Sequence, residues 1–484
     1  MPCDQSSTCL YAGVAKRDIS THAQNVSVND PLYLKVLVLD DGIRKVAVIA
    51  MDTVAIGGPY DVKDDFLERL KTLVKQEFGI LDVMLNATHS HTVMPMLCDD
   101  REQLQKAIEA VREACSDMVP VKIGSGTGYE DSIMINRTLR LKNGSHWTIR
   151  QANPCPPDHE VESLGPVDPQ IGILRVDRLD GSSLAVVYTF SCHPLLGVPD
   201  GSITANFPGF ASKVIEENYN TTAIFLQGTG GDVTEVLYKD ITRPMDSKPV
   251  GQTLGLSTLK ALKDIPTGNV TMNHITESVQ FPRRTDIPMR IENLQYERNI
   301  LLKSLINTSL NFRSFLPLYI KYALNPDYPS DYSYRYMHEE ARGVRELRRL
   351  DQLNKQRIDK YLNNITIMEK LARIENNIST LETYLKLNEE SGEDTISAEI
   401  HGIRIGDFVM VTSPTETLVE VGLNIRKSSP YEKTYVISPS NGYMQYGAPE
   451  SYYDKGGYEV TECMLGSGWQ KIYEEKAMEI IGRL

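Results

Sequence analysis

Short apolar runs alternate with amphipathic segments along the first half of the chain, and this alternation limits the fold class more than any other feature of the sequence. Residues 34–39 and 46–51 are apolar runs on either side of Asp41-Gly42, a pair typical of hairpin turns. Residues 62–78 place apolar side chains at helical spacing before Gly79, which favours a helix end. The same reasoning predicts helices at 101–117 and 210–219, a second hairpin at 171–192 and a strand at 222–226. We therefore expect an α/β fold in which mixed β-sheets are flanked by helices.

The composition changes between residues 290 and 390, where Glu, Lys, Arg, Leu and Asn dominate. Apolar residues recur there three and four positions apart, which predicts two or three long helices with a break at residues 326–329. We interpret this region as a helical insertion within one domain that spans residues 1–484. A coiled-coil dimerisation arm is the alternative, although the heptads are irregular. Strand signals return at 399–411, and a last helix is predicted from 469 to 482.

The chain has 51 basic and 64 acidic residues, a formal net charge of −13. Surfaces that bind nucleic acid usually carry a basic excess, so we expect no nucleic-acid partner. No apolar run approaches the roughly 18 residues of a transmembrane helix. The first ten residues have neither the basic nor the apolar region of a signal peptide, which favours the cytoplasm unless a leader was removed before residue 1. The seven cysteines form no CxxC pair and do not predict a zinc site built from cysteine.

Three of the nine histidines follow strand-like apolar runs. His89 and His91 end one such run, and His193 follows another. Residues i and i+2 of a strand face the same side, so His89 and His91 can point toward one place. Neutral imidazole is a common zinc ligand, and a catalytic zinc normally takes three protein groups and a water. A lone histidine is more often a hydrogen-bonded core residue, but three at two strand ends favour a metal site.

A glycine-rich turn, QGTGGDVT at 227–234, follows the predicted strand 222–226. Glycines at a strand end allow backbone N–H groups to approach a ligand and form an anion-binding nest. The turn lacks both the GK[ST] ending of a Walker A loop and the GxGxxG spacing of a dinucleotide site. Thr234 is a candidate nucleophile, although a threonine in this position is more often a turn or helix cap.

Seven sequence blocks occur in the order found in the neutral, non-lysosomal ceramidases. They are NATHSH (86–91), INR (135–137), GPVDPQIGILRVD (165–177), FSCHP (190–194), GTGGDVT (228–234), SPTE (413–416) and NGYMQYGAPESYYDKGGYE (441–459). The segment AGVAKRDIS (12–20) resembles the opening of that family as well. One block alone is weak evidence, but together they resemble the family's catalytic domain nearly from end to end.

This resemblance implies a zinc-dependent hydrolase that cleaves the amide bond of an N-acylated substrate, a ceramide-like lipid or another N-acyl compound. The positions that match the family's zinc ligands are His89, His193, Glu416 and Tyr446, which together offer imidazole, carboxylate and phenol donors.

Three further residues take catalytic roles by the same resemblance. His91 would face the substrate and the attacking group, Tyr458 would hydrogen-bond the developing oxyanion, and Arg137 would contact the substrate. The alternatives are that Arg137 is a structural ion-pair partner and that Tyr446 and Tyr458 are packing residues.

The chain departs from the family pattern at Thr234, which stands where those enzymes have a catalytic serine followed by Pro-Asn. The threonine methyl crowds the site, so a mechanism in which zinc-activated water attacks the amide and His91 transfers protons fits better. The chain ends soon after Tyr458, so we expect the family's C-terminal β-sandwich domain to be absent. A zinc esterase or deacetylase, and a binding protein that keeps the site without turnover, remain the alternative functions.

Overall fold

The computed structural model describes residues 10–150, 155–236 and 245–484, and these divide into two units. The first comprises the described residues up to Arg284 together with Glu393–Leu484, and the second is Thr285–Gly392. The first unit combines mixed β-sheets with flanking helices, so the expected α/β fold class is confirmed. That the two units act as one domain stays a prediction.

The larger sheet of the first unit has eight strands. Their order is β12 (Thr222–Gln227), β11 (Ser183–Phe190), β10 (Gln170–Arg178), β5 (Val119–Tyr129), β1 (Tyr11–Asp18), β2 (Tyr33–Asp40), β3 (Lys45–Met51) and β4 (Asp82–Ala87). Both predicted hairpins are confirmed, because β2 pairs antiparallel with β3 and β10 pairs antiparallel with β11. The outermost pairs, β3 with β4 and β11 with β12, are parallel. The sheet is therefore mixed.

The smaller sheet has four strands, β14 (Met272–Pro282), β15 (Thr395–Ile405), β16 (Phe408–Thr412) and β18 (Lys433–Ile437). The strand signal at 399–411 is in fact two antiparallel strands, because the chain turns at Gly406 with φ 63°. The two sheets pack face to face through a buried apolar layer that includes Val48, Leu174, Ile403 and Met410.

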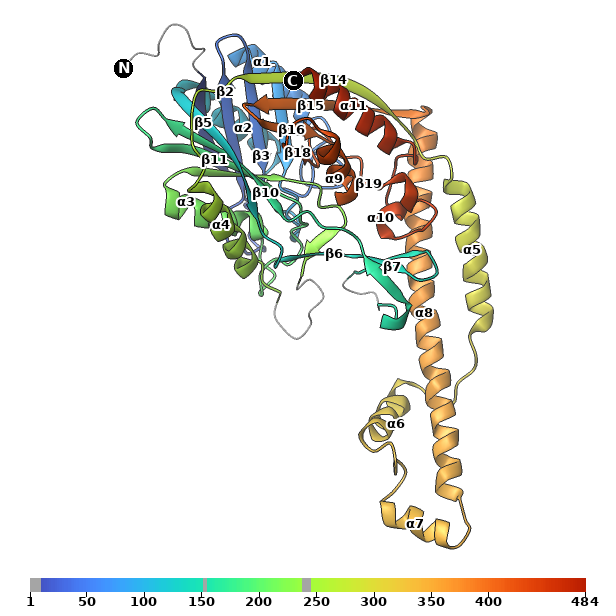
Figure 1. The fold of residues 1–484 in the computed structure, drawn as a ribbon. Coiled ribbons are helices and arrows are strands. Elements are labelled where there is room, and N and C mark those ends of the chain that lie inside the picture. The colour runs from blue at the N-terminus through green and yellow to red at the C-terminus, as the bar shows by residue number, and fades with distance from the viewer. Residues whose placement is uncertain (1–9, 151–154, 237–244) are drawn as a thin grey trace. The chain divides into compact units, whose positions relative to one another are not determined.

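Helices cover the outer face of each sheet. α1 (Phe66–Phe78) and α2 (Asp100–Ser116) cover one half of the larger sheet, and α3 (Asn206–Tyr219) and α4 (Lys248–Leu262) cover the other. α9 (Val419–Ser428) and α11 (Trp469–Arg483) cover the smaller sheet, which completes four layers (Figure 1). α3 begins four residues before the predicted start because Pro208 fits the first turn, where its missing N–H costs nothing.

Short elements extend from the strand ends. β13 (Val233–Glu235) pairs with β6 (Met134–Asn136), and β17 (Glu416–Thr417) pairs with β19 (Tyr446–Gly447). A further sheet contains β8 (His146–Thr148), β7 (Thr138–Leu141) and β9 (Val161–Leu164), and α10 is Tyr458–Thr461.

The second unit consists of four helices, α5 (Ile287–Ser304), α6 (Phe312–Leu324), α7 (Ser333–Ala341) and α8 (Glu346–Ser391). The predicted break at 326–329 is confirmed, since it lies between α6 and α7. Two long helices were predicted correctly, α5 with 18 residues and α8 with 46, whereas the two shorter helices α6 and α7 between them were not foreseen as separate elements. Within the described residues, no helix has the length and apolar content that would let it cross a membrane.

Candidate metal centre

The candidate site lies at the carboxyl ends of strands from both large sheets. β4 is followed by His89 and His91, β11 by His193, and β16 and β18 by the segments that carry Glu416 and Tyr446. β11 runs parallel to β12 and β16 parallel to β18, so the carboxyl ends of each pair share one edge. Ligand sites of α/β folds commonly occupy this position.

Hydrogen bonds fix these strand ends to one another. Ala87 N donates to Pro439 O at 3.2 Å, and Ser438 N donates to Gln227 O at 2.9 Å. The Asn86 side chain accepts from Gln227 N at 2.8 Å and donates to Pro439 O at 2.9 Å. Segments that are far apart in the sequence are thereby held together around the site.

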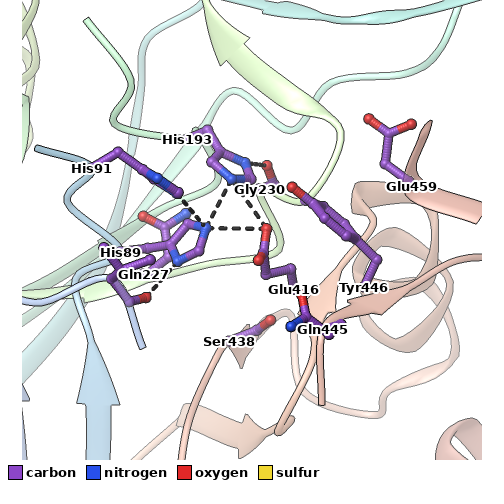
Figure 2. Close-up of polar contacts among 12 residues, drawn as sticks. His89, His91, His193, Gln227, Gly230, Glu416, Ser438, Gln445, Tyr446 and Glu459 are labelled. Carbon is purple, nitrogen blue, oxygen red and sulfur yellow. Dashed lines mark hydrogen bonds and ion pairs between the residues drawn. The ribbon is translucent and has the colours of Figure 1, made fainter. Parts of the chain in front are cut away.

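Three imidazoles and one carboxylate point toward one place (Figure 2). Nε2 of His89 lies 2.8 Å from Nε2 of His193 and 3.3 Å from Nε2 of His91. Oε2 of Glu416 lies 3.1 Å from Nε2 of His89 and 3.2 Å from Nε2 of His193. His89, His193 and Glu416 are buried, and His91 is half-buried. The three histidines form a group that can hold a metal ion.

The hydrogen bonds of Nδ1 in His89 and His193 determine that Nε2 of each ring faces the Glu416 carboxylate. Nδ1 of His89 lies 2.6 Å from the carbonyl oxygen of Val54, and Nδ1 of His193 lies 2.7 Å from that of Gly230. A carbonyl oxygen only accepts, so each Nδ1 carries the proton and each neutral ring keeps a lone pair on Nε2. Oε2 of Glu416 has no hydrogen-bond donor among the described residues. Two nitrogen lone pairs and a carboxylate oxygen this close repel one another unless a cation lies between them, so the donor set fits a divalent metal ion.

The protonation states agree with this interpretation. Burial, helped by the nearby His89, lowers the pKa of His193 to about 4. Burial and the two neighbouring imidazoles lower the pKa of His91 well below its usual value. Burial alone would raise the pKa of Glu416, but positive charge on the neighbouring His89 and His193 would lower it well below its usual range, and a cation bound between the neutral rings would act in the same direction. Neutral imidazoles and an ionised carboxylate are the forms that bind metal.

The backbone conformation that places His89 here was not predicted from the sequence. His89 and His91 converge as predicted, but the explanation that both lie on the same face of a strand was wrong, because the strand β4 ends at Ala87. Instead, His89 has a left-handed backbone with φ 65° in the loop after the strand. A non-glycine residue in this region is uncommon, although histidine adopts it more readily than most, and such residues cluster at functional sites.

Tyr443 contacts Glu416, and the sequence did not predict this contact. Its hydroxyl donates to Oε1 of Glu416 at 2.5 Å, while Oε2 of that carboxylate faces the imidazoles. A charge-assisted hydrogen bond of this kind orients a carboxylate that binds metal. The segment 441–459 contains five tyrosines, and no spacing in the sequence distinguishes Tyr443 from the others.

Arg137 connects Tyr446 to a second buried carboxylate. Its guanidinium donates to the Tyr446 hydroxyl at 2.9 Å, to Oε1 of Glu459 at 2.7 Å and to Gly231 O at 2.8 Å. The ion pair with Glu459, which the sequence analysis did not foresee, is buried on both sides. Figure 2 shows Tyr446 beside His193, and the two rings stack with their centroids 6.4 Å apart. Arg137 is thus an ion-pair partner, and its contact with a substrate stays a prediction.

Tyr458 begins α10 and is half-buried next to these groups. Its ring meets that of Tyr446 edge to face at 5.5 Å, and the Arg150 guanidinium lies 3.8 Å from its ring centroid. Burial raises the pKa of Tyr458 above its usual value, so the phenol keeps its proton and can donate a hydrogen bond.

The glycine-rich turn directs carbonyl oxygens toward the site. Gly230 O accepts from His193 Nδ1, and Gly231 O accepts from Arg137. The N–H of Gly231 is occupied, since it donates to Thr417 O at 3.0 Å. The prediction of an anion-binding nest was therefore wrong at these two glycines, because their carbonyl oxygens accept hydrogen bonds from His193 and Arg137 instead.

Thr234 lies in β13 beside His193, and the two residues form a short parallel bridge. Its hydroxyl donates to Oε2 of Glu235 at 3.2 Å. Oε1 of Glu235 accepts from the main-chain N–H of Leu195 at 2.8 Å. Burial raises the pKa of Glu235 to about 7. Thr234 therefore lies beside His193, but its hydroxyl is hydrogen-bonded to the neighbouring Glu235 carboxyl group.

Two solved structures share the fold of this chain. Neutral ceramidase from Pseudomonas aeruginosa matches with a TM-score of 0.60 at 13% sequence identity, over 99% of this chain and 75% of that one. A ceramidase complexed with C2 matches with the same TM-score and identity, over 99% of this chain and 76% of that one. No model of a protein family matches the chain, and no curated protein matches it. The chain thus has a ceramidase-like fold, which at this identity says nothing by itself about activity.

Proposed function

We propose that this protein is a zinc-dependent hydrolase of the neutral ceramidase type that cleaves the amide bond of an N-acylated substrate. The observation that carries the proposal is the convergence of two imidazole lone pairs and the Glu416 carboxylate within 3.2 Å. Two further findings support it: the ceramidase-like fold and the position of the site at the strand ends.

In this proposal the metal is held by His89, His193 and Glu416, with Tyr446 as the fourth ligand. Imidazole, carboxylate and phenol oxygen are all donors that zinc accepts. When bound, zinc supplies a Lewis acid and lowers the pKa of water, as in other metal-dependent hydrolases. Burial and the neighbouring Glu416 carboxylate raise the pKa of Tyr446 well above its usual value, so without a bound metal the phenol keeps its proton, and Arg137 donates a hydrogen bond to its oxygen.

His91 is the residue that we propose as proton carrier. It is neutral at pH 7, is half-buried, and lies 3.3 Å from His89. In amide hydrolysis, water adds its oxygen to the carbonyl carbon while one of its protons moves to a base. The same proton then passes to the amine nitrogen as the C–N bond breaks. His91 would carry that proton, Tyr458 would donate to the carbonyl oxygen as it becomes negative, and Arg137 would contact the substrate.

The contacts of Thr234 support a mechanism without a side-chain nucleophile. A nucleophilic hydroxyl needs an adjacent base that is free to take its proton, whereas the partner of Thr234 is Glu235, which itself accepts from main-chain N–H groups. Thr234→Val keeps the side-chain shape and removes the hydroxyl, so this variant should keep its zinc and most of its hydrolytic rate. Loss of hydrolysis with zinc retained would instead identify Thr234 as the nucleophile.

The first test is the zinc content per chain. Purified protein should contain about one zinc, and both His193→Ala and Glu416→Ala should lose it. His274→Ala is the matched control, since His274 is a buried histidine that contacts Asp82 at the opposite end of β4 from His89, and its variant should keep the metal. A protein that takes up no zinc even after reconstitution would refute the proposal.

The second test concerns the reaction. Paired amide and ester analogues with the same acyl chain separate an amidohydrolase from the esterase or deacetylase alternative. Zinc at full occupancy without hydrolysis of any acylated compound would favour a binding protein.

A further inference from the structure

Helix α6 of the second unit exposes an apolar stripe. The stripe consists of residues spaced three or four positions from one another, together with one adjacent pair, so that they share one face of the helix. They are Phe312, Leu316, Tyr319, Ile320 and Leu324. Their exposed fractions range from 41% at Leu316 to 81% at Leu324. Large apolar side chains this exposed are expected singly on a protein surface, whereas a continuous stripe marks an interaction site.

The opposite face of α6 already has its partner. Phe315 and Tyr322 pack with Ile358 of α8 in a small apolar cluster, and the Phe315 ring stacks on Tyr361 at 4.4 Å. The Tyr322 hydroxyl also donates to Asp351 of α8 at 3.0 Å. The helix is thereby fixed to α8 through one face, and the exposed stripe is not needed to hold it there.

The charges on α6 differ in sign from those of the whole chain. Its only charged residues are Arg313 and Lys321, while the chain as a whole has a net charge of −13. Lys321 uses one N–H to donate to Ser330 O at 3.0 Å and has two more donors available. An apolar face bordered by cations and free of acidic groups is typical of helices that lie in the interface of an anionic membrane.

The next helix, α7, adds side chains of the same kind. Tyr332, at the residue before α7, is 75% exposed, and Tyr334 and Met337 are 66% and 57% exposed. The rings of Tyr332 and Tyr334 stack at 6.2 Å. Tyrosine favours the membrane–water interface because its ring is apolar and its hydroxyl remains hydrated.

We propose that α6, with the tyrosines that precede and begin α7, is a docking surface for an anionic lipid bilayer. The apolar stripe would lie among the lipid headgroups and upper acyl chains, with Arg313 and Lys321 beside the lipid phosphates. A second copy of the chain fits this surface less well, because two such helices would bring their cations together and two bodies of charge −13 would repel one another. The inference goes beyond the proposed hydrolysis and does not depend on it.

Vesicle flotation tests this surface with the full-length protein. The protein should float with phosphatidylcholine vesicles that are rich in phosphatidylglycerol and much less with phosphatidylcholine alone. The double variant Ile320→Glu/Leu324→Glu should bind at least tenfold more weakly. The matched control is Ile43→Glu/Leu81→Glu, which makes the same two substitutions at exposed positions of the first unit and should bind as the unmodified protein does. Helical content by circular dichroism verifies that both variants are folded.

If the double variant unfolds, a milder single variant still tests the proposal. Arg313→Gln removes one cation and no packing, so it should weaken binding to the anionic vesicles, as added salt should. The proposal is overturned if the unmodified protein does not bind anionic vesicles, or if both double variants bind equally. It is also overturned if the protein is a dimer that dissociates in the α6 variant, since the stripe would then bind a second copy.

Discussion

Removing the hydroxyl of Tyr443 should weaken metal binding without disturbing the fold. In Tyr443→Phe the ring remains, but Oε1 of Glu416 loses a half-buried donor at 2.5 Å. A hydrogen bond to a charged group contributes about 1.5–3 kcal/mol. If about 2 kcal/mol of this serves to hold Oε2 toward the imidazoles, the zinc dissociation constant rises about 30-fold.

The assay is competition for zinc against a chromophoric chelator at fixed pH. Tyr452→Phe is the matched control, because its hydroxyl also donates to a glutamate, Glu420, at 3.0 Å, but away from the site. The control should bind zinc as the unmodified protein does. The reasoning is refuted if Tyr443→Phe is folded and its zinc affinity equals that of the control, since Glu416 would then be oriented by other contacts.

Three further predictions concern stability and the turn beside the site. Because burial raises the pKa of Glu235 to about 7, the folded state binds more protons than the unfolded state between the two pKa values, so stability falls as pH rises through this window. Glu235→Gln keeps the shape of the side chain and should remove this loss, which amounts to about 2.5 kcal/mol of unfolding free energy between about pH 5 and pH 8, measured by denaturant titration. A Cβ at Gly231 would lie 2.5 Å from the main-chain oxygen of Glu416, a proposed metal ligand, so Gly231→Ala should lower the zinc content, whereas Gly482→Ala, with nothing within 4 Å, should not. Arg137→Ala leaves Glu459 buried without its partner and should lower the unfolding free energy by about 3–5 kcal/mol; a smaller loss would mean that water reaches the carboxylate.

Local periodicity was sufficient to predict most of the fold. The hairpin at Asp41-Gly42 and the helix α2 follow from alternation, helical spacing and turn residues, which depend only on neighbours in the sequence. The start of α1 was placed four residues early, because Lys63, Asp64 and Asp65 continue the helical pattern in sequence without joining the helix.

The candidate site was predictable only in part, since its chemistry could be recognised but its geometry could not. His89, His193 and Glu416 were identified by residue type and by the resemblance, and the structure brings all three together. The contact from Tyr443 to Glu416 depends on tertiary positions that no local pattern encodes. The left-handed conformation of His89 is likewise invisible in the sequence, because nothing in the residue type requires it.

An identity of 13% to a neutral ceramidase is compatible with a shared fold because the core and the candidate site place different requirements on the sequence. Buried positions of the two sheets require apolar side chains of suitable volume, and many sequences meet that requirement. A metal centre requires particular donor atoms at particular strand ends. The blocks NATHSH, FSCHP, GTGGDVT and SPTE follow β4, β11, β12 and β16, where the donors or their supporting carbonyl groups lie. A chain can therefore share only 13% identity with a neutral ceramidase and still contain recognisable sequence blocks. This requires only that the blocks lie at the strand ends that form the candidate site.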